Sequence, residues 1–459
     1  MTDLQKAFER FKDISDRYTA LFGYYDGNQP LRYSTQRLRD AFQQLDVRFR
    51  ENWCAVVIDA VLDRMELYGW STGDEKITQV LTDVWEESGL ALESNEVHES
   101  ALVCGESFLI GWQDEGQPLE FYYNDPRQAA VFYDPDHPRV KSFAAKWWDS
   151  DDGCRMVLYY PDRLEHYLAA GRTMAAIDAG TGVTAFRMEE ETPNPYGMIP
   201  VFHFRNSLRK KSNRTLYDEL KSGKVVLTHK SELDNVTELQ DSVNKLFCDM
   251  MVTAEFDAFP ARYVISSAEI SPLKNAPNQI WDLPAGIGEG QGTQVGTLEA
   301  ANLANYSGQI DHIVNAVAAI TRTPRHYFEN QGANVSGEAL VTMEAPLVKK
   351  VNQKRELFGS VWQEVALFAL QVMGMTARRK DIQPQWGAAE SDQPLTEAQI
   401  IKTNRDAGLP LKTALRLNGY TDAEIEIVEQ EIAEEKQSQD LSALYLQMAR
   451  DESAQKDEI

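Results

Sequence analysis

The chain has 459 residues, which at the usual ~100–200 residues per domain allows two to four structural units. Its 71 acidic and 46 basic residues give a formal charge of −25, which argues against a protein that holds nucleic acid through its net charge, because Lys and Arg drive phosphate binding. The 43% hydrophobic and 25% charged content excludes an intrinsically disordered chain.

Cysteine usage and the N-terminus indicate a soluble protein made in a reducing compartment, the cytoplasm. The four cysteines (Cys54, Cys104, Cys154 and Cys248) form no CxxC pair, so neither a zinc knuckle nor a disulfide framework is expected. The charged first residues do not resemble a signal peptide. The longest apolar stretch, near Val365–Met375, is far shorter than a membrane span.

Helices are predicted before residue 105 and strands after it. Apolar residues recur at three- and four-residue steps from Leu38 to Met65, which predicts a helix that ends at Gly69. A second helix is expected over Glu75–Glu87, and a third from Glu93 into a strand at Ser107–Trp112. Short aromatic or β-branched runs separated by turn residues then predict an antiparallel meander. These runs are Phe121–Tyr123, Ala130–Tyr133, Ser142–Trp148, Met156–Tyr160, Glu165–Leu168 and Val183–Met188, with a final strand at Val201–Phe204.

The second half of the chain is predicted to be mainly helical. Ser231–Phe256 has the pattern of a helix with Ser231 as its N-cap, and the Pro- and Gly-rich residues 260–300 predict loops and strands. Helix resumes at about Leu298–Thr321, followed by a polar stretch and a long helix over about Glu338–Met375. Pro346 lies inside that helix, where its missing N–H and its ring predict a kink.

The C-terminal part is expected to hold short helices. We predict a loop at Gln383–Trp386, helices at Thr396–Ala407, Leu411–Asn418 and Thr421–Glu435, and a frayed tail.

Signatures of catalysis are weak throughout the chain. The glycine run Gly286–Gly292 has the spacing of neither nucleotide-binding loop, and Ser336 lacks the first glycine of a nucleophile elbow. Asp149–Gly153 is better interpreted as a hairpin turn than as a calcium loop. His98 and Glu99 could form an acid–base pair, although such a pair is usually structural, and no histidines have metal-ligand spacing on one helix. We expect no catalytic residue, no cofactor and no metal.

Basic residues gather locally in three places: Arg205–Arg214, Lys349–Arg355 and Arg378–Lys380. Each is either a solvated face or a contact with phosphates or with an acidic neighbour.

The order of these elements resembles the portal proteins of long-tailed bacteriophages and related prophages. Several short motifs carry the resemblance over about four hundred residues. They are Tyr24–Gly27, Asn52–Gly69, Ala101–Phe108, Ile199–Asn206, Ser231–Leu233 with the residues up to Tyr263, and Thr323-Pro324 followed by Asn334–Leu340. One departure is that His229-Lys230 stands where the family often has Gly before Ser231.

The resemblance implies an α+β portal fold, with an α/β wing, a two-helix stem, a small α/β clip, a long kinked wing helix and a helical crown. Carried onto this sequence, the parts are wing 1–230, stem helix 231–259, clip 260–300, second stem helix 301–321, tunnel loop 322–337, wing helix 338–378, crown 379–435 and tail 436–459.

The resemblance also implies a function: a dodecameric ring at one capsid vertex of the virion, through which double-stranded DNA enters during packaging and leaves at infection. Implied partners are other copies of the chain, the terminase large subunit, a head-completion adaptor, and the major capsid and scaffolding proteins, with no membrane. A non-catalytic scaffolding or adaptor protein is the alternative, and a stand-alone α+β enzyme is a more distant one.

Site residues follow from the same resemblance. The tunnel loop is expected to present Asn330, Gln331, Asn334 and Val335 to DNA, and the clip to bind partners through Leu273, Lys274, Asn278 and Trp281. Four basic residues could contact DNA or a neighbouring subunit: Arg322, Arg325, Lys349 and Lys350. An acidic channel wall is compatible with DNA that passes through, because it lowers the affinity that would stall the duplex.

Overall fold

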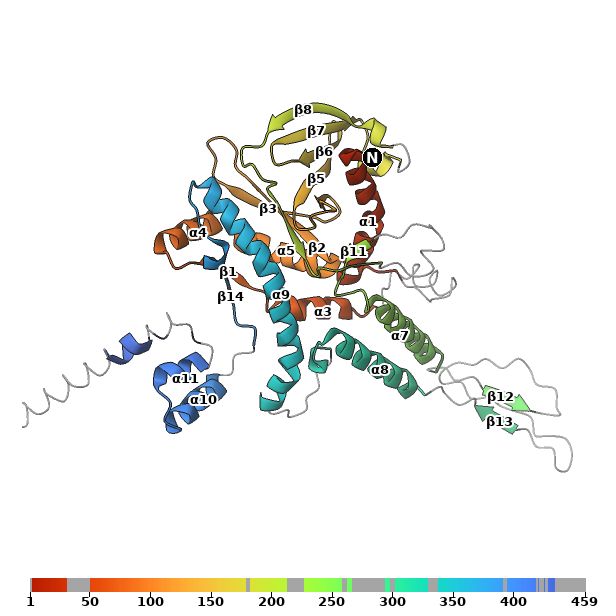
Figure 1. Ribbon diagram of the computed structural model, residues 1–459. Helices are drawn as coiled ribbons and strands as arrows, with labels where there is room; N and C mark the ends of the chain where they lie inside the picture. The colour runs from red at the N-terminus through yellow and green to blue at the C-terminus, as the bar shows by residue number, and fades with distance from the viewer. Residues whose placement is uncertain are drawn as a thin grey trace, which may run out of the picture. The chain divides into compact units, whose positions relative to one another are not determined.

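The computed structural model has a mixed α+β structure (Figure 1). It describes residues 2–30, 50–178, 182–212, 227–257, 262–265, 294–297, 302–328, 337–390, 394–417, 420, 425 and 428–433. The chain divides into two units, Met1–Glu390 and Ser391–Ile459.

Four helices of the first unit precede or flank its strands: α1 (Asp3–Tyr25), α3 (Trp53–Leu62), α4 (Glu75–Glu87) and α5 (Leu90–Cys104). Polar side chains begin three of them, because the first N–H groups of a helix have no partner within it. Thr2, Asn52 and Asp74 accept bonds from the backbone of α1, α3 and α4. The predicted bounds of α4 are confirmed, and α5 begins three residues before the predicted start, with Gly89 in a left-handed conformation as its N-cap.

Five of the predicted runs form an antiparallel sheet in the order β4-β5-β6-β7-β8, which confirms most of the meander. The predicted first run, Phe121–Tyr123, lies in β3 (Glu120–Asn124) and belongs to another sheet. Its strands are β4 (Ala129–Tyr133), β5 (Lys141–Ser150), β6 (Gly153–Tyr159), β7 (Arg163–Ala170) and β8 (Arg187–Pro193). The 3₁₀ turns η1 (Met174–Ala176) and η2 (Gly182–Ala185) precede β8. The expected strand at Val183–Met188 is therefore wrong in its first half, where Val183 lies in η2 and is partly buried against the cluster that α1 forms with the sheet.

A second sheet, β3-β2-β9, connects the first sheet to the helices. It consists of β2 (Glu106–Trp112), β3 (Glu120–Asn124) and β9 (Val201–Arg205). Phe108 and Ile110 of β2 pack against Val131 and Ala144 of the meander. Phe8 and Phe11 of α1 cover another apolar cluster with Phe143 of the same sheet. These contacts follow from the period-two alternation of strands, which directs successive side chains to opposite faces.

The longest helix, α9 (Gly337–Val372), crosses the first unit and confirms the predicted long helix, with Pro346 inside it (Figure 1). Its apolar stripe enters the main core, where Leu347, Phe358 and Trp362 are fully buried. The stripe is exposed near its beginning, since Met343 is 40% exposed. The kink at Pro346 stays a prediction.

Two further helices, α7 (Thr237–Asp257) and α8 (Ala304–Thr321), lie side by side and run antiparallel (Figure 1). Val243 and Val314 share one apolar cluster, and the hydroxyls of Thr253 and Tyr306 are 3.1 Å apart. The predicted start of α7 at Ser231 is wrong. The Ser231 hydroxyl accepts a bond from Leu233 N and donates to Val103 O, so it closes a turn on α5 and the helix begins six residues later.

Three two-stranded sheets complete the described strands. They pair β10 (Lys210–Ser212) with β11 (Leu227–His229), β12 (Arg262–Ile265) with β13 (Gln294–Thr297), and β1 (Leu67–Ser71) with β14 (Gln383–Trp386).

The β1–β14 pair corrects two predictions. The predicted loop at Gln383–Trp386 is a strand, and Gly69 lies within β1 and does not end a helix. Ile382 after η4 (Arg379–Asp381) is fully buried in the main core, so residues 379–390 belong to the first unit. The second unit contains α10 (Pro394–Asp406) and α11 (Leu411–Leu417). In the predicted helix Thr421–Glu435, the described residues 425 and 428–433 are helical, whereas Thr421 and the tail lie outside the described residues.

Candidate functional site

The side chain of Arg64, directly after α3, contacts both flanks of residues 329–336. The 3₁₀ turn η3 (Arg325–Tyr327) precedes these residues, and α9 follows them. Arg64 donates a 2.7 Å bond to the Tyr327 hydroxyl and lies 3.2 Å from the Glu344 carboxylate of α9, with both charged side chains 12% exposed. Burial raises the pKa of Tyr327, so the phenol stays protonated. One guanidinium therefore connects η3 and the N-terminal part of α9 to the end of α3.

Helix α8 ends at a residue whose backbone is in the left-handed conformation. Arg322 has φ = 59°, is exposed, and is the C-cap, with its N–H bonded to Ala318 O. A non-glycine residue in this region is strained unless its surroundings hold it. Here the Thr321 hydroxyl bonds both Val317 O and the Thr323 hydroxyl. The chain therefore leaves α8 in one defined direction.

A buried carboxylate joins α9 to the turn that precedes α7. Glu232 lies 2.8 Å from the Lys350 ammonium and 2.7 Å from that of Lys354, with all three side chains at most 12% exposed. Lysines four residues apart lie on one helix face, which lets them share an acid. Burial raises the pKa of Glu232, but the two lysines outweigh burial and hold the pKa well below its usual range. We call Glu232, Lys350 and Lys354 the lysine clamp.

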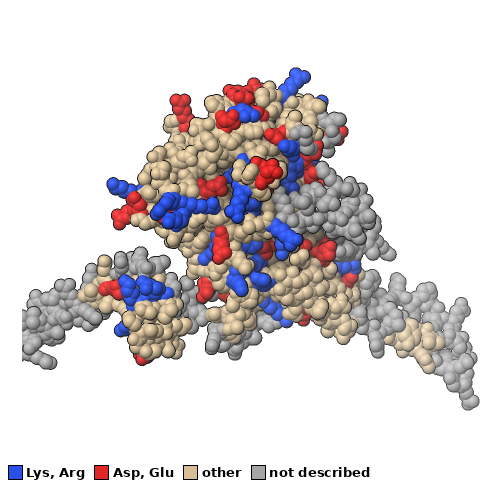
Figure 2. Space-filling view, in the orientation of Figure 1, with Lys and Arg blue, Asp and Glu red and all other residues tan. Residues whose placement is uncertain are grey.

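The basic candidates therefore occupy different environments. Arg325 is 3.8 Å from Asp311 of α8, and Lys350 is engaged in the lysine clamp. Lys349 and Arg322 are exposed, as is Pro346 on α9. On the face drawn in Figure 2, basic and acidic side chains lie next to one another.

The other predicted site residues lie outside the described part of the chain. These are Leu273, Lys274, Asn278, Trp281, Asn330, Gln331, Asn334 and Val335, together with the glycine run Gly286–Gly292 and Ser336.

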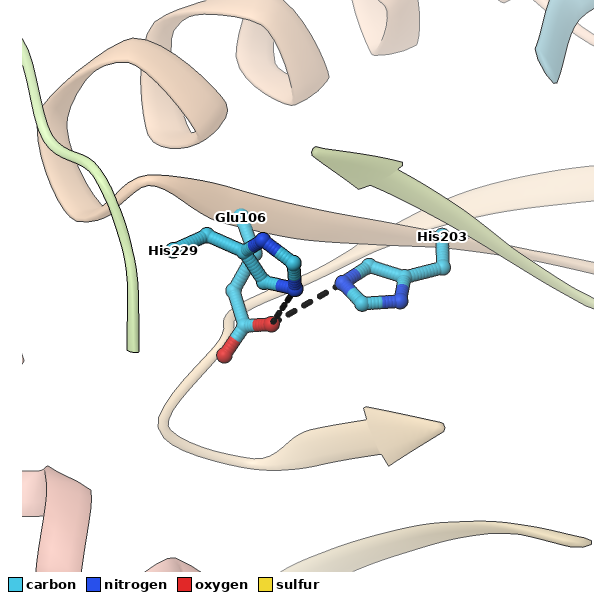
Figure 3. Close-up of side chains that lie close together, drawn as sticks. All are labelled: Glu106, His203 and His229. Atoms are coloured by element: carbon cyan, nitrogen blue, oxygen red, sulfur yellow. Dashed lines mark hydrogen bonds and ion pairs between the residues drawn. The ribbon is translucent and has the colours of Figure 1, made fainter. Parts of the chain in front are cut away.

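A polar cluster that sequence reasoning missed is buried between β2, β9 and β11 (Figure 3). Its members are Glu106, His203 and His229, each at most 4% exposed. His203 Nε2 is 2.9 Å and His229 Nε2 3.9 Å from the same oxygen, Glu106 Oε2. The other oxygen accepts 2.5 Å bonds from Arg10 and Tyr18 of α1.

Opposite charge dominates the electrostatics of this cluster. Burial acts to raise the pKa of Glu106, but Arg10 and His203 outweigh it and hold that pKa well below its usual range. Burial lowers the pKa of His203 to about 3, so its imidazole is neutral. The three residues are the one group with metal-ligand spacing among the described residues. No motif within one helix or strand indicates this cluster, because its side chains come from three strands.

The possible acid–base pair of His98 and Glu99 is not a reactive site. His98 is fully buried, accepts a 2.9 Å bond from the Trp362 indole, and burial lowers its pKa to about 3. Glu99 accepts instead from the Tyr25 hydroxyl at 3.3 Å. The predicted hairpin turn at Asp149–Gly153 is confirmed between β5 and β6.

Within the described ranges, no helix has both the length and the apolar character needed to cross a membrane.

Comparisons with known proteins agree over most of the chain. The family model described as "Phage portal protein, SPP1 Gp6-like" matches residues 4–438. The portal protein of Mycobacterium phage L5 is 24% identical over 391 residues, covering 80% of this chain and 74% of the relative. The portal protein of Mycobacterium phage D29 is 24% identical over 446 residues, covering 88% and 85%.

Two solved structures also align with the chain. One is from the virion of a native gene transfer agent particle, with a TM-score of 0.47, 11% identity, and coverage of 85% of this chain and 95% of that one. The other is from the neck of the empty particle, with a TM-score of 0.47, 12% identity and the same coverage.

Proposed function

The chain belongs to the family of SPP1 Gp6-like phage portal proteins, and on that premise we propose that it forms a dodecameric ring at one capsid vertex. Proteins of this family are non-catalytic components of the virion at the head-to-tail connection. The ring is the channel through which double-stranded DNA enters during packaging and leaves at infection. The observation that carries this proposal is the family match over residues 4–438, which spans nearly the whole chain.

The described elements support an assignment of the portal parts. The antiparallel helices α7 and α8 correspond to the stem (231–259 and 301–321), residues 260–300 between them to the clip, and residues 322–337 to the tunnel loop. Helix α9 is the proposed wing helix (338–378), and Pro346 lies inside it, where we expect a kink. Residues 1–230 form the wing, 379–435 the crown and 436–459 the tail, although residues 379–390 pack within the first unit.

The tunnel loop is the proposed point of closest approach to DNA. Asn330, Gln331, Asn334 and Val335 carry no charge, so their contacts with a duplex are weak and easily broken. The contacts of Arg64 with Tyr327 and Glu344 support this role, because they hold both ends of the loop on α3 and α9.

Basic residues near the loop have different proposed roles. Arg322 and Lys349 are exposed and contact phosphates or a neighbouring subunit. Arg325 of η3 is oriented toward α8 by Asp311, and Lys350 stabilises the chain through its ion pair with Glu232.

Partner binding is assigned to the clip and to the faces inside the shell. Leu273, Lys274, Asn278 and Trp281 bind the terminase large subunit during packaging and the head-completion adaptor afterwards. The wing and crown contact the major capsid and scaffolding proteins.

Electron microscopy of the purified full-length chain tests the proposal. We expect class averages of a ring with an axial hole and twelve- or thirteen-fold symmetry, since isolated portal rings need not have the symmetry of the assembled particle. A compact monomer at every concentration tested would overturn it. A channel role further requires that capsids assembled without this chain contain no packaged DNA.

A further inference from the structure

We propose that Glu106, His203 and His229 bind one divalent transition-metal ion, with Zn²⁺ as the first candidate, and that this ion fastens β11 to β2 and β9. The possible ligand atoms of the three side chains all lie within 4.8 Å of one another. Two imidazoles and one carboxylate are a donor set that zinc and related ions use in proteins.

The strand register brings two of the ligands together. Glu106 of β2 pairs with Arg205 of β9, and Phe108 pairs with His203, so Glu106 and His203 are diagonal neighbours on one face of the sheet. His229, the last residue of β11, approaches the same carboxylate oxygen from a different part of the chain (Figure 3). All three side chains are buried, which excludes the bulk water that would compete for a metal.

The second nitrogen of each imidazole has a partner that orients the ring. His229 Nδ1 lies 2.6 Å from Ser207 O, and because a carbonyl oxygen only accepts, this nitrogen carries the proton. In the neutral form of the ring, His229 Nε2, which faces Glu106, carries the lone pair that a metal needs. Metal-ligating histidines commonly donate their other N–H to a backbone carbonyl in this way.

His203 can provide the second lone pair without losing a net proton. Its Nε2–H donates to Glu106 Oε2, and its Nδ1 lies 3.1 Å from the Tyr133 hydroxyl. When a metal takes the position of the Nε2 proton, the neutral ring carries its proton on Nδ1 instead. The Tyr133 hydroxyl oxygen can accept that proton in a hydrogen bond.

The donor atoms of this cluster favour imidazole-binding ions over calcium or magnesium. Arg10 and Tyr18 hold Glu106 Oε1, so only Oε2 is directed at the imidazoles. Ca²⁺ and Mg²⁺ need several oxygen ligands, whereas this cluster offers one oxygen and two nitrogens. The positive charge of Arg10 weakens the binding of any cation, so we expect a lower affinity than that of a site without it.

The ion would hold the connection that leads into α7. β11 ends at His229, and the turn that starts at Ser231 precedes α7. The backbone here is already close to β2, since a Cβ on Gly105 would lie 2.4 Å from His229 O. A bond from His229 to a shared metal therefore fixes the approach to α7 without moving the chain.

Metal analysis of tag-free, full-length protein tests the proposal. The protein is produced in zinc-supplemented medium, dialysed against a chelator, and titrated with Zn²⁺ and, separately, with Co²⁺. We expect about one zinc per chain by elemental analysis after gel filtration, a Co²⁺ absorption spectrum of nitrogen and oxygen ligands, and a melting temperature that rises with added Zn²⁺.

Two variants of the ligand and one matched control make the test specific. His229→Ala should lower the zinc affinity at least about tenfold, and His229→Gln provides the same test if the alanine variant fails to fold. His166→Ala removes another strand histidine, whose Nε2 is 3.2 Å from the Thr192 hydroxyl, and should leave binding unchanged. Equal zinc content in all of these proteins, or no zinc in the wild type, would overturn the proposal. If the melting temperature of the protein responds to pH but not to added Zn²⁺, the cluster holds a proton and no metal, and that result also overturns the proposal.

Discussion

Replacing Glu232 by Gln should strongly destabilise the chain, because it leaves two ammonium groups buried without their shared carboxylate. Removing one partner from a buried ion pair costs about 3–5 kcal/mol. Lys350 and Lys354 each retain a backbone acceptor at 3.0 Å, Thr321 O and Asn206 O respectively. We therefore expect the lower end, about 3 kcal/mol, which corresponds to a fall of roughly 3–6 °C in melting temperature for a unit of this size.

Thermal unfolding at one fixed protein concentration measures this effect, since assembly makes the melting temperature depend on concentration. Glu356→Gln is the matched control, because it makes the same substitution at an exposed position of α9 and should change stability by no more than about 0.5 kcal/mol. The double variant Glu232→Gln with Lys354→Met should lose less stability than the sum of the losses in the two single variants, by at least about 1 kcal/mol. Equal melting temperatures for Glu232→Gln and Glu356→Gln would refute the reasoning.

The Glu232 carboxylate should also make the stability of the folded chain fall as the pH is lowered. The pKa of Glu232 is lower in the folded chain than in the unfolded one, where it is about 4.3. Its contribution is therefore fully present above about pH 4.3 and is lost as the pH falls toward the folded-state pKa. Between about pH 5 and pH 3, the melting temperature of the wild type should fall more steeply than that of Glu232→Gln. Parallel curves would contradict this assignment.

Three further substitutions, together with one control, test other parts of the structure. Gly105→Ala should prevent folding or lower the free energy of unfolding by more than about 3 kcal/mol, because the added Cβ would lie 2.4 Å from the backbone oxygen of His229. Gly89→Ala is the control: Gly89 also has a positive φ, but open space surrounds it, so thermal unfolding should show a loss of about 1 kcal/mol. Arg64→Lys should lower the free energy of unfolding by about 1–2 kcal/mol, because Lys lacks the planar guanidinium that reaches both the Tyr327 hydroxyl and Glu344. Rings should still form, but the fraction of DNA-filled capsids should fall. Pro346→Ala should straighten α9, move the proposed tunnel loop and lower DNA filling while the fold is retained; normal filling would count against the kink.

Local sequence patterns predicted the helices and strands that form without depending on contacts with distant segments. The helix Glu75–Glu87, most strands of the meander and the long helix agree with the structure because their apolar periodicity is strong. The errors concern contacts between distant segments. β14 is a strand only because β1 pairs with it from more than three hundred residues away, and α7 starts late because Ser231 bonds α5.

The candidate sites were predicted less well for the same reason. The basic group at Lys349–Arg355 was compatible with a solvated face, a phosphate contact or an acidic neighbour, and only the fold identifies that neighbour as Glu232, more than a hundred residues earlier in the chain. Glu106 stands in a segment that resembled the family, but nothing local indicates that two histidines from other strands would meet it. Patterns within one helix or strand do not identify partners that only the tertiary fold supplies.

The buried ion pairs show which of the basic side chains are neutralised within the chain itself. Several basic side chains that are less than a fifth exposed are paired with acids of the same chain: Arg10 with Glu106, Arg64 with Glu344, and Lys350 and Lys354 with Glu232. These pairs take four positive and three negative charges away from solvent, so they leave the acidic excess of −25 almost unchanged. An acidic protein binds DNA weakly, which suits the proposed channel, because the duplex must be released from it. The acidic excess also means that neighbouring subunits repel one another, so the proposed ring must be held together by apolar packing and by local pairs across heterologous contacts.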